Sequence, residues 1–175
     1  MIKRFAGIFF LAISILYGGA VIAQAKDTVP GCRYIKNATG YLMVLRQGDD
    51  VMKELEKLGR LEQLPFASVT GIGFAHRVTF GFYDFERKKF NPKTFNKVEM
   101  ANLTGSIAWS DGQPSLHLHG TATDEKFDAY GGHILELSVG TGSMEIYLHV
   151  QAQKLQRKVE QPLNANVLQL ECPAG

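Results

Sequence analysis

Six β-rich runs follow one another from Phe66 to Gln153, and they limit the fold of this chain more than any other feature of the sequence. Apolar and β-branched residues recur in each run, and Gly, Asp, Asn or Pro residues separate the runs. The runs are 66–74, 76–85, 96–109, 115–123, 133–141 and 143–153, and a weaker strand pattern covers 41–45. Because the intervening turns are short, we expect mostly antiparallel strands.

A single helix is predicted before these six runs. In the segment VMKELEKLG, the apolar residues Val51, Leu55 and Leu58 recur at helical spacing, directly after Gly-Asp-Asp at 48–50. An aspartate at this place can cap the first turn of the helix. The combined pattern predicts an α+β fold, in which one main flanking helix packs on a curved, open and barrel-like antiparallel β-sheet. The pattern does not specify the order of the strands.

The N-terminal residues have the pattern of a secretory signal peptide. Lys3 and Arg4 precede an apolar segment, and Ala23-Gln24-Ala25 is the small-x-small pattern of a cleavage site. We therefore expect cleavage before Lys26, an exported protein in the periplasm or secreted, and no membrane span after cleavage. The alternative is an uncleaved membrane anchor, for which the apolar segment is short.

The charge balance argues against nucleic acid as a partner. The whole chain has 19 Lys and Arg and 17 Asp and Glu, and two of the basic residues but none of the acidic ones lie in 1–25. The chain without its signal peptide is therefore formally neutral. Proteins that bind nucleic acids obtain most of their affinity from clustered Lys and Arg. The one basic run, 87–89, falls in a predicted loop.

The rest of the chain is long enough for one domain, and no repeat or low-complexity linker divides it. We expect an N-terminal segment at 26–40, the domain at 41–153 and a C-terminal tail at 154–175. Cys32 and Cys172 lie near the two ends, and disulfides persist in exported proteins. The favoured prediction is a Cys32–Cys172 bridge that ties the tail to the N-terminal segment. Two unpaired thiols or an intermolecular bridge are the alternatives.

Three histidines form the candidate metal site. In the segment SLHLHG, His117 and His119 share one face of a predicted strand, while Leu116 and Leu118 point to the other face. Two such imidazoles can converge on one cation, and His133, which follows two glycines, can supply a third nitrogen. Such a site keeps a position open for water or a ligand. The alternative is three ordinary histidines with ordinary hydrogen bonds.

The segment 45–150 resembles the plants-and-prokaryotes-conserved domain, abbreviated PPC or PCC. The landmarks occur in the family's order: GDD at 48–50, SVTGIGFAHRVTFGFYD at 68–84, KVEMANLTGSI at 97–107, PSLHLHG at 114–120 and GGHILE at 131–136. The resemblance implies a curved antiparallel sheet with a flanking helix, and an assembly that is commonly a homotrimer. It also implies a divalent metal at His117, His119 and His133, as in some prokaryotic members. The fold is further similar to that of acetolactate decarboxylase, a zinc enzyme.

Two features of the plant members of this family do not carry over. Their Gly-Arg-Phe-Glu-Ile-Leu segment, which recruits other proteins, corresponds to residues 96–101 here, where only Glu99 matches. Lys97 replaces the arginine, and lysine does not reproduce a bidentate arginine contact. The chain also has no AT-hook core of the Arg-Gly-Arg type. DNA binding is therefore the weakest of the functions that the resemblance suggests.

Zinc is the leading candidate for the metal, because neutral imidazole suits it, and other divalent metals stay open. Three neutral ligands leave the charge of the ion uncompensated, so the ion would attract a small anionic ligand or acidify a bound water. Catalysis also needs an acid or a base, and Glu99 and Glu136 are the nearest carboxylates by motif. Each can equally be a neighbour that orients the ligands or a salt-bridged residue.

Two functions are consistent with these features. The first is an exported, trimeric binding module, in which the metal holds a small anionic ligand or stabilises the assembly. The second is a metal-dependent enzyme, such as a lyase or hydrolase acting on a small oxo- or carboxylic acid. The binding module is preferred because the sequence shows no evident acid–base pair. His76 and His149 lie in other predicted strands and are excluded from the site.

Overall fold

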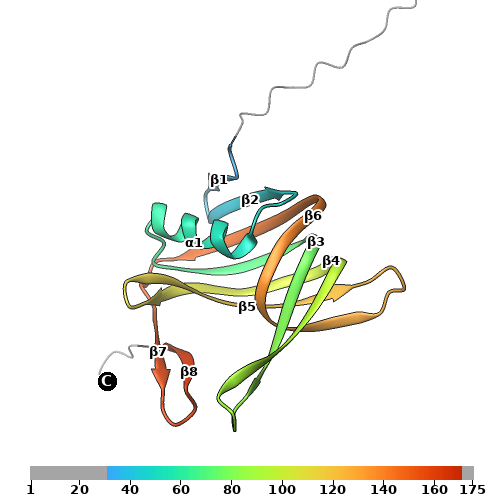
Figure 1. The fold of residues 1–175 in the computed structure, drawn as a ribbon. Helices are drawn as coiled ribbons and strands as arrows, with labels where there is room; N and C mark the ends of the chain where they lie inside the picture. The colour runs from blue at the N-terminus through green and yellow to red at the C-terminus, as the bar shows by residue number, and fades with distance from the viewer. Residues whose placement is uncertain (1–30, 171–175) are drawn as a thin grey trace, which may run out of the picture. The chain divides into compact units, whose positions relative to one another are not determined.

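The computed structural model describes residues 31–170, so the predicted signal peptide and Cys172 lie outside the described residues. One sheet contains all the strands, and a single helix precedes the longest of them (Figure 1). The elements are β1 (Tyr34–Asn37), β2 (Gly40–Arg46), α1 (Val51–Leu61), β3 (Phe66–Asp84), β4 (Lys89–Ser110), β5 (Gln113–Thr123), β6 (Ala129–Gln151), β7 (Gln156–Glu160) and β8 (Ala165–Gln169). In this part of the chain, no helix is both long and apolar enough to cross a membrane.

Four of the strands close into a partial ring. The strand order is β1-β2-β6-β3-β4-β7-β8, and β5 pairs with both β4 and β6. Because β5 connects β4 to β6, the strands β3, β4, β5 and β6 curve around until the sheet meets itself (Figure 1). All pairs are antiparallel except the short contact between β4 and β7. The predicted α+β fold, with a curved, barrel-like antiparallel sheet and one helix, is confirmed.

Two pairs of predicted strands are single long strands in the structure. The runs 66–74 and 76–85 both belong to β3, and the runs 133–141 and 143–153 both lie largely in β6. Gly73, inside the first of these runs, marks a place where β3 and β6 approach one another closely. A Cβ atom on Gly73 would lie 2.4 Å from the carbonyl oxygen of Ser143 in β6. The pairing register of β3 and β6 shifts just after Gly73, as it does at β-bulges.

The hydrophobic core includes the inner face of the helix and one face of the sheet. Asp50 caps α1, because its side chain accepts a hydrogen bond from the Lys53 N–H at 3.2 Å. The buried face of the helix packs near β5 and β6. Leu118 of β5 is fully buried in this core, whereas His117 and His119 point away from it. The alternation predicted for this strand therefore holds, and it directs both imidazoles to the opposite face.

The segment predicted as a C-terminal tail contains an antiparallel hairpin, β7–β8. Its two strands have five residues each and a mostly polar sequence, so alternation gives only a weak strand signal. The hairpin is held to the rest of the molecule near Trp109, whose backbone N–H donates to the carbonyl of Leu155, the residue before β7, at 3.1 Å. The ammonium of Lys154 lies 4.9 Å from the centre of the Trp109 ring.

Candidate metal centre and its cavity

The three predicted histidines meet at the junction of β5 and β6. His119 lies directly opposite His133 in the pairing of these strands, and His117 is two residues away on the same face. The Nε2 atoms of His117 and His119 are 3.2 Å apart, and each pair among the three rings has centroids 5.2 Å apart. One nitrogen from each ring lies within 4.8 Å of the other two. The structure therefore brings together all three nitrogens.

This arrangement fits a zinc ion. Zinc–nitrogen distances of about 2.0–2.1 Å in tetrahedral geometry separate the ligand atoms by about 3.4 Å. The spacing of 3.2 Å between the Nε2 atoms of His117 and His119 is close to this value, and a nitrogen of His133 lies within 4.8 Å of both rings' ligand atoms. Bound there, zinc would supply a Lewis-acidic centre with a free coordination position.

Glycines allow the strands to approach one another behind the histidines. A Cβ atom on Gly105 of β4 would lie 2.0 Å from the carbonyl oxygen of His117, and one on Gly131 would lie 2.7 Å from the carbonyl oxygen of Gly120. Distances below 3.0 Å are not found for real Cβ atoms. The absence of side chains at these positions thus lets β4, β5 and β6 hold the imidazoles close together.

The histidines lie at the wall of a cavity of about 530 Å³, a size that suits a small molecule. The tip of the β3–β4 hairpin and the β7–β8 hairpin form the other walls. The lining residues are Gly81, Phe82, Tyr83, Phe85, Phe90, Leu116, His117, His119, Gly132, His133, Arg157, Asn164, Ala165 and Asn166. None of these residues is a carboxylate, so within the described part of the chain the walls are aromatic and polar or positively charged.

Aromatic contacts connect the metal site to the C-terminal hairpin. The Phe90 ring stacks on His133, with centroids 4.8 Å apart and an interplanar angle of 18°. Tyr83 packs edge-on against both Phe90 and Phe85, with centroids 5.0 Å apart in each pair. The hydroxyl of Tyr83 donates to the carbonyl of Asn164, in the β7–β8 turn, at 3.0 Å. The two hairpins thus contact one another beside the cavity.

The environment favours the neutral form of two of the imidazoles. Burial, with smaller contributions from His117 and His119, lowers the pKa of His133 to about 4. Burial also lowers the pKa of His117, with smaller effects from Arg157 and His119. A metal ion binds the neutral form of imidazole, so protons compete little for these two nitrogens at neutral pH.

Arg157 of β7 lines the same cavity, and sequence reasoning did not identify it. The side chain is only 3% exposed. It donates hydrogen bonds to the carbonyl of Ser115 and to Oγ of Ser106, the latter at 2.6 Å, whereas its Nε–H has no partner among the described residues. Burial lowers the pKa of this guanidinium. The only signal in the sequence is one basic residue in a polar tail, which does not indicate burial.

The other candidate residues lie elsewhere. Glu136 is 3.4 Å from Arg77 and accepts a hydrogen bond from Thr79 at 3.1 Å, and Glu99 is exposed on β4. Neither carboxylate lines the histidine cavity. His76 and His149, which the sequence analysis excluded, are exposed and do not line it either.

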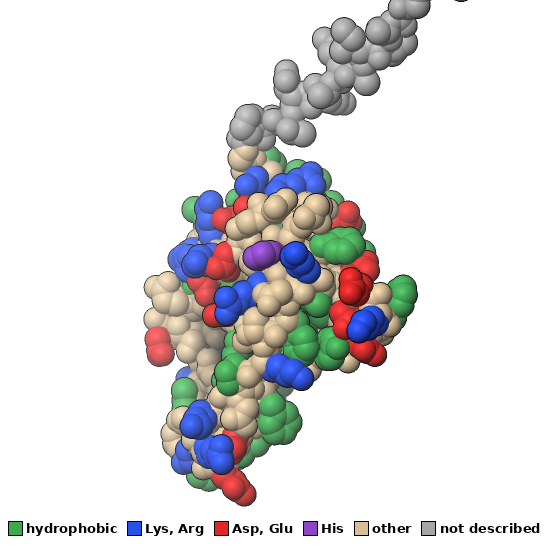
Figure 2. Space-filling view, turned by 45° about the vertical axis from the view of Figure 1, so that its right-hand side comes forward, with side chains coloured by type: hydrophobic (Ala, Val, Ile, Leu, Met, Phe, Trp, Pro, Cys, Tyr) green, Lys and Arg blue, Asp and Glu red, His purple; other side chains and the backbone are tan. Residues whose placement is uncertain are grey.

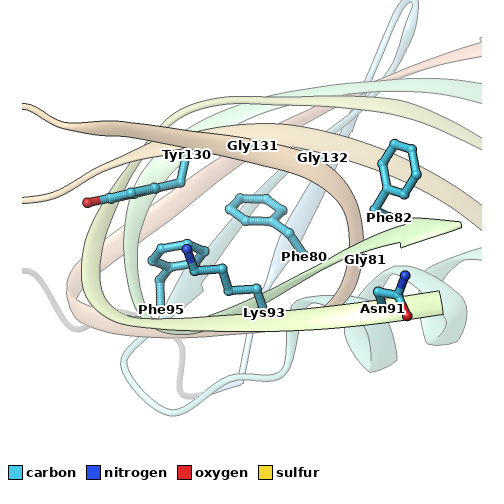
Figure 3. A pocket seen from close by; sticks show the side chains of 9 residues that line it. All are labelled: Phe80, Gly81, Phe82, Asn91, Lys93, Phe95, Tyr130, Gly131 and Gly132. Carbon is cyan, nitrogen blue, oxygen red and sulfur yellow. The ribbon is translucent and has the colours of Figure 1, made fainter.

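A second, smaller cavity of about 280 Å³ shares Gly81, Phe82 and Gly132 with the first. Figure 3 shows Tyr130 and Phe95 at one end of it and Phe82 and Asn91 at the other. The Phe95 and Tyr130 rings stack with centroids 4.2 Å apart, and the Lys93 ammonium lies 5.2 Å from the centre of the Phe95 ring. The lysine is thus partly engaged by the aromatic rings.

Three solved structures are similar to this fold. A candidate DNA-binding protein from Ralstonia eutropha JMP134 is 58% identical, with a TM-score of 0.78 over 79% of this chain and 96% of that one. A plant- and prokaryote-conserved protein from Pyrococcus horikoshii is 24% identical, with a TM-score of 0.69 over 83% of this chain and 100% of that one. A metal-containing protein from Archaeoglobus fulgidus is 21% identical, with a TM-score of 0.67 over 78% and 98% of the two chains.

Residues 33–150 match the sequence profile of the Plants and Prokaryotes Conserved (PCC) domain. No curated protein matches the chain. The family match covers the helix and the strands that carry the three histidines, and it ends before the β7–β8 hairpin that contributes Arg157. The chain belongs to the PCC domain family, as its ordered motifs predicted.

Proposed function

We propose that this protein is a binding module in which His117, His119 and His133 hold a divalent metal ion, with zinc as the first candidate. The ion binds a small anionic ligand in the adjoining cavity. The convergence of three imidazoles at the wall of that cavity carries this proposal. The related fold of the archaeal metal-containing protein is consistent with it, although the low identity relates the two only by fold.

A metal-dependent lyase or hydrolase is the second candidate. The observation that favours it is Arg157, a cation beside the metal site that could bind an acidic substrate. Catalysis also requires a positioned acid or base, and no Asp or Glu of residues 31–170 lines the cavity. We therefore place binding ahead of catalysis.

DNA binding is not proposed, although the relative from Ralstonia eutropha is described as a candidate DNA-binding protein. Figure 2 shows Lys and Arg side chains interspersed with Asp and Glu on the face that it presents. Several basic side chains are also paired with carboxylates, as in the Arg33–Asp49 contact of 2.8 Å. A face on which both signs of charge alternate contributes little affinity for the phosphate backbone at physiological salt.

The test of the metal site is metal analysis of purified wild-type protein and of the His117→Ala, His119→Ala and His149→Ala variants after equilibration with zinc. We expect about one ion per chain in the wild type and in His149→Ala, which alters an exposed histidine outside the site. The other two variants should retain less than a fifth of that content, with circular dichroism spectra like that of the wild type. Equal metal content in all four proteins would refute the site.

We further propose that the protein is exported after cleavage before Lys26 and that Cys32 pairs with Cys172. Cys32 is exposed, near the start of the described chain, and therefore accessible to a partner. Mass spectrometry of protein recovered from the periplasm or medium should give the mass of residues 26–175 less two hydrogens. An intact N-terminus would contradict export by cleavage, and two titratable thiols under non-reducing denaturation would exclude the bridge.

A further inference from the structure

Arg157 is a buried cation without an anionic partner among residues 31–170. Its side chain is 3% exposed, and none of the ion pairs within residues 31–170 includes it. Moving a charged group out of water costs free energy, and buried charges are therefore usually paired with an opposite charge. The contacts with Ser115 and Ser106 supply neutral acceptors only. A charge in this position is best explained by an anion that binds beside it.

The hydrogen bonds by which Arg157 anchors the β7–β8 hairpin do not by themselves require a positive charge. A guanidinium has five N–H donors, and Arg157 uses one from each terminal nitrogen for Ser115 and Ser106. The Nε–H has no acceptor in the described chain. The charge of the guanidinium is therefore not compensated by a carboxylate of the described chain, and a planar fork of this kind matches a carboxylate.

The position of Arg157 directs that ligand to the histidines. Ser106 lies opposite His117 in the pairing of β4 and β5, and Ser115 is two residues before His117 on the same face of β5. The guanidinium that contacts both serines is therefore next to His117 on the cavity side of the sheet, and it lines the cavity with the three imidazoles. A carboxylate bound to the guanidinium would therefore lie in the same cavity as the three imidazoles.

The other walls of the cavity suit a ligand with an apolar body. Phe82, Phe85 and Phe90 line it, and Tyr83 packs against the last two. A volume of about 530 Å³ admits a molecule with one aromatic ring or a short aliphatic chain. The combination of aromatic walls and a cation at one side is typical of a site for an amphipathic acid.

We propose that the cavity binds a small monocarboxylic acid, whose carboxylate pairs with Arg157 and whose apolar body lies against Phe82, Phe85 and Phe90. The contribution of the metal ion to this binding rests on the proposed function above, whereas the pairing with Arg157 does not. Arg157 therefore selects charged over neutral ligands, and the hairpin that carries it is a specificity element outside the family match.

Calorimetric titration with phenylacetate and with phenylacetamide, its neutral analogue of similar shape, tests the proposal. Wild-type protein should bind phenylacetate at least tenfold more tightly than phenylacetamide. Arg157→Met should lose that preference, and Arg157→Lys should keep part of it. Lys158→Met, which removes the exposed charge next in sequence, should behave as wild type. Equal binding of the two compounds by the wild type, or no binding of either, would overturn the proposal.

The same titrations of zinc-loaded and metal-free wild-type protein separate this proposal from the metal site. A preference for phenylacetate in both forms supports the role of Arg157 in ligand binding. This conclusion holds even if metal analysis shows the same zinc content in the wild type and in the histidine variants. A preference that persists unchanged in Arg157→Met overturns the role of Arg157 and leaves the metal site intact.

If Arg157→Met does not fold, a second variant tests the proposal. Ser106→Ala removes one hydrogen-bond acceptor of Arg157 and keeps its charge, so this variant should retain the preference for phenylacetate. If a folded Ser106→Ala protein bound phenylacetate and phenylacetamide equally, this result would count against the proposal.

Discussion

Gly105 determines how closely β4 approaches β5 behind the histidines. Its φ angle is +155°, and a Cβ atom at this position would lie 2.0 Å from the carbonyl oxygen of His117, so both the backbone and the available space exclude a side chain. The constraint acts on the backbone of His117 itself and therefore on the position of its imidazole. A residue with no chemical function of its own thus sets the geometry of the candidate metal site.

We expect Gly105→Ala to lower the free energy of unfolding by about 1–3 kcal/mol more than Gly112→Ala, because the added methyl group overpacks the strand pair. Gly112 also has a positive φ angle, +76°, but a Cβ atom there would meet nothing within 4 Å. This variant therefore controls for backbone strain alone. Urea unfolding measures both values, and metal analysis should show weaker zinc retention only in Gly105→Ala. Equal stability of the two variants would contradict this explanation.

Because the pKa of His133 is lowered in the folded protein, we expect the metal-free protein to become less stable in acid. Because the folded state holds this pKa at about 4, below the ordinary value of 6.5, the unfolded chain takes up the proton first. The contribution of His133 to the free energy of unfolding is therefore complete above pH 6.5 and is lost as the pH falls towards 4. Urea unfolding from pH 7.5 to 4 should show the wild type losing stability relative to His133→Asn. A difference between the two proteins that does not change with pH would refute the prediction.

At the scale of elements, the β7–β8 hairpin completes the cavity. It contributes Arg157, Asn164 and Asn166 to the walls, and the tip of the β3–β4 hairpin contributes most of the aromatic side chains. The side-chain amide of Asn166 also donates to Oγ of Ser115 at 3.3 Å, so this hairpin has polar contacts with β5 beside the histidines. The strands within the family match carry the three histidines, whereas the β7–β8 hairpin, which lies outside the match, forms part of the cavity wall beside them.

Tyr83 holds the two hairpins together, and Tyr83→Phe should release that contact. The variant loses the hydroxyl that donates to the carbonyls of Leu163 and Asn164, at a cost of about 0.5–1.5 kcal/mol. We expect faster amide hydrogen exchange in 156–169, with little change in α1. Tyr147→Phe is the control, because Tyr147 is exposed on β6 and makes no hydrogen bond through its hydroxyl within residues 31–170. Unchanged exchange in the hairpin would show that other contacts hold it.

At the scale of the whole molecule, large apolar side chains remain exposed on the single chain. Ile72 and Phe74 of β3 are 55% and 49% exposed, and Phe127 in the β5–β6 turn is 86% exposed. Exposed apolar groups of this size are typical of surfaces that bind other proteins. The homotrimer that the family resemblance implies stays a prediction, and these side chains are candidates for its interface.

Light scattering should therefore give a mass of three chains at micromolar concentration. Phe74→Lys should shift the mass towards one chain, because the charge would be buried at an apolar interface. Lys53→Glu, at an exposed position on α1, is the control and should leave the assembly unchanged. A wild-type mass of one chain would exclude the trimer.

Much of the fold and part of the site could be predicted from the sequence. Alternation predicted the strands, and helical spacing after an aspartate predicted α1. The two runs within β3, and the two within β6, were interpreted as separate strands, because a sequence does not distinguish a break between two strands from an irregularity within one long strand. Arg157 was missed for a related reason, since neither composition nor periodicity shows that a polar hairpin folds back over the sheet.

The sequence by itself determined that His117 and His119 share a face opposite to the buried Leu118, because side-chain alternation is a local property of any strand. The family motifs added His133 as an expectation. Only the tertiary structure decided that His133 lies opposite His119 and that Arg157 lines the same cavity. These relations depend on strand register and on the packing of a distant hairpin, which arise from contacts between residues far apart in the chain.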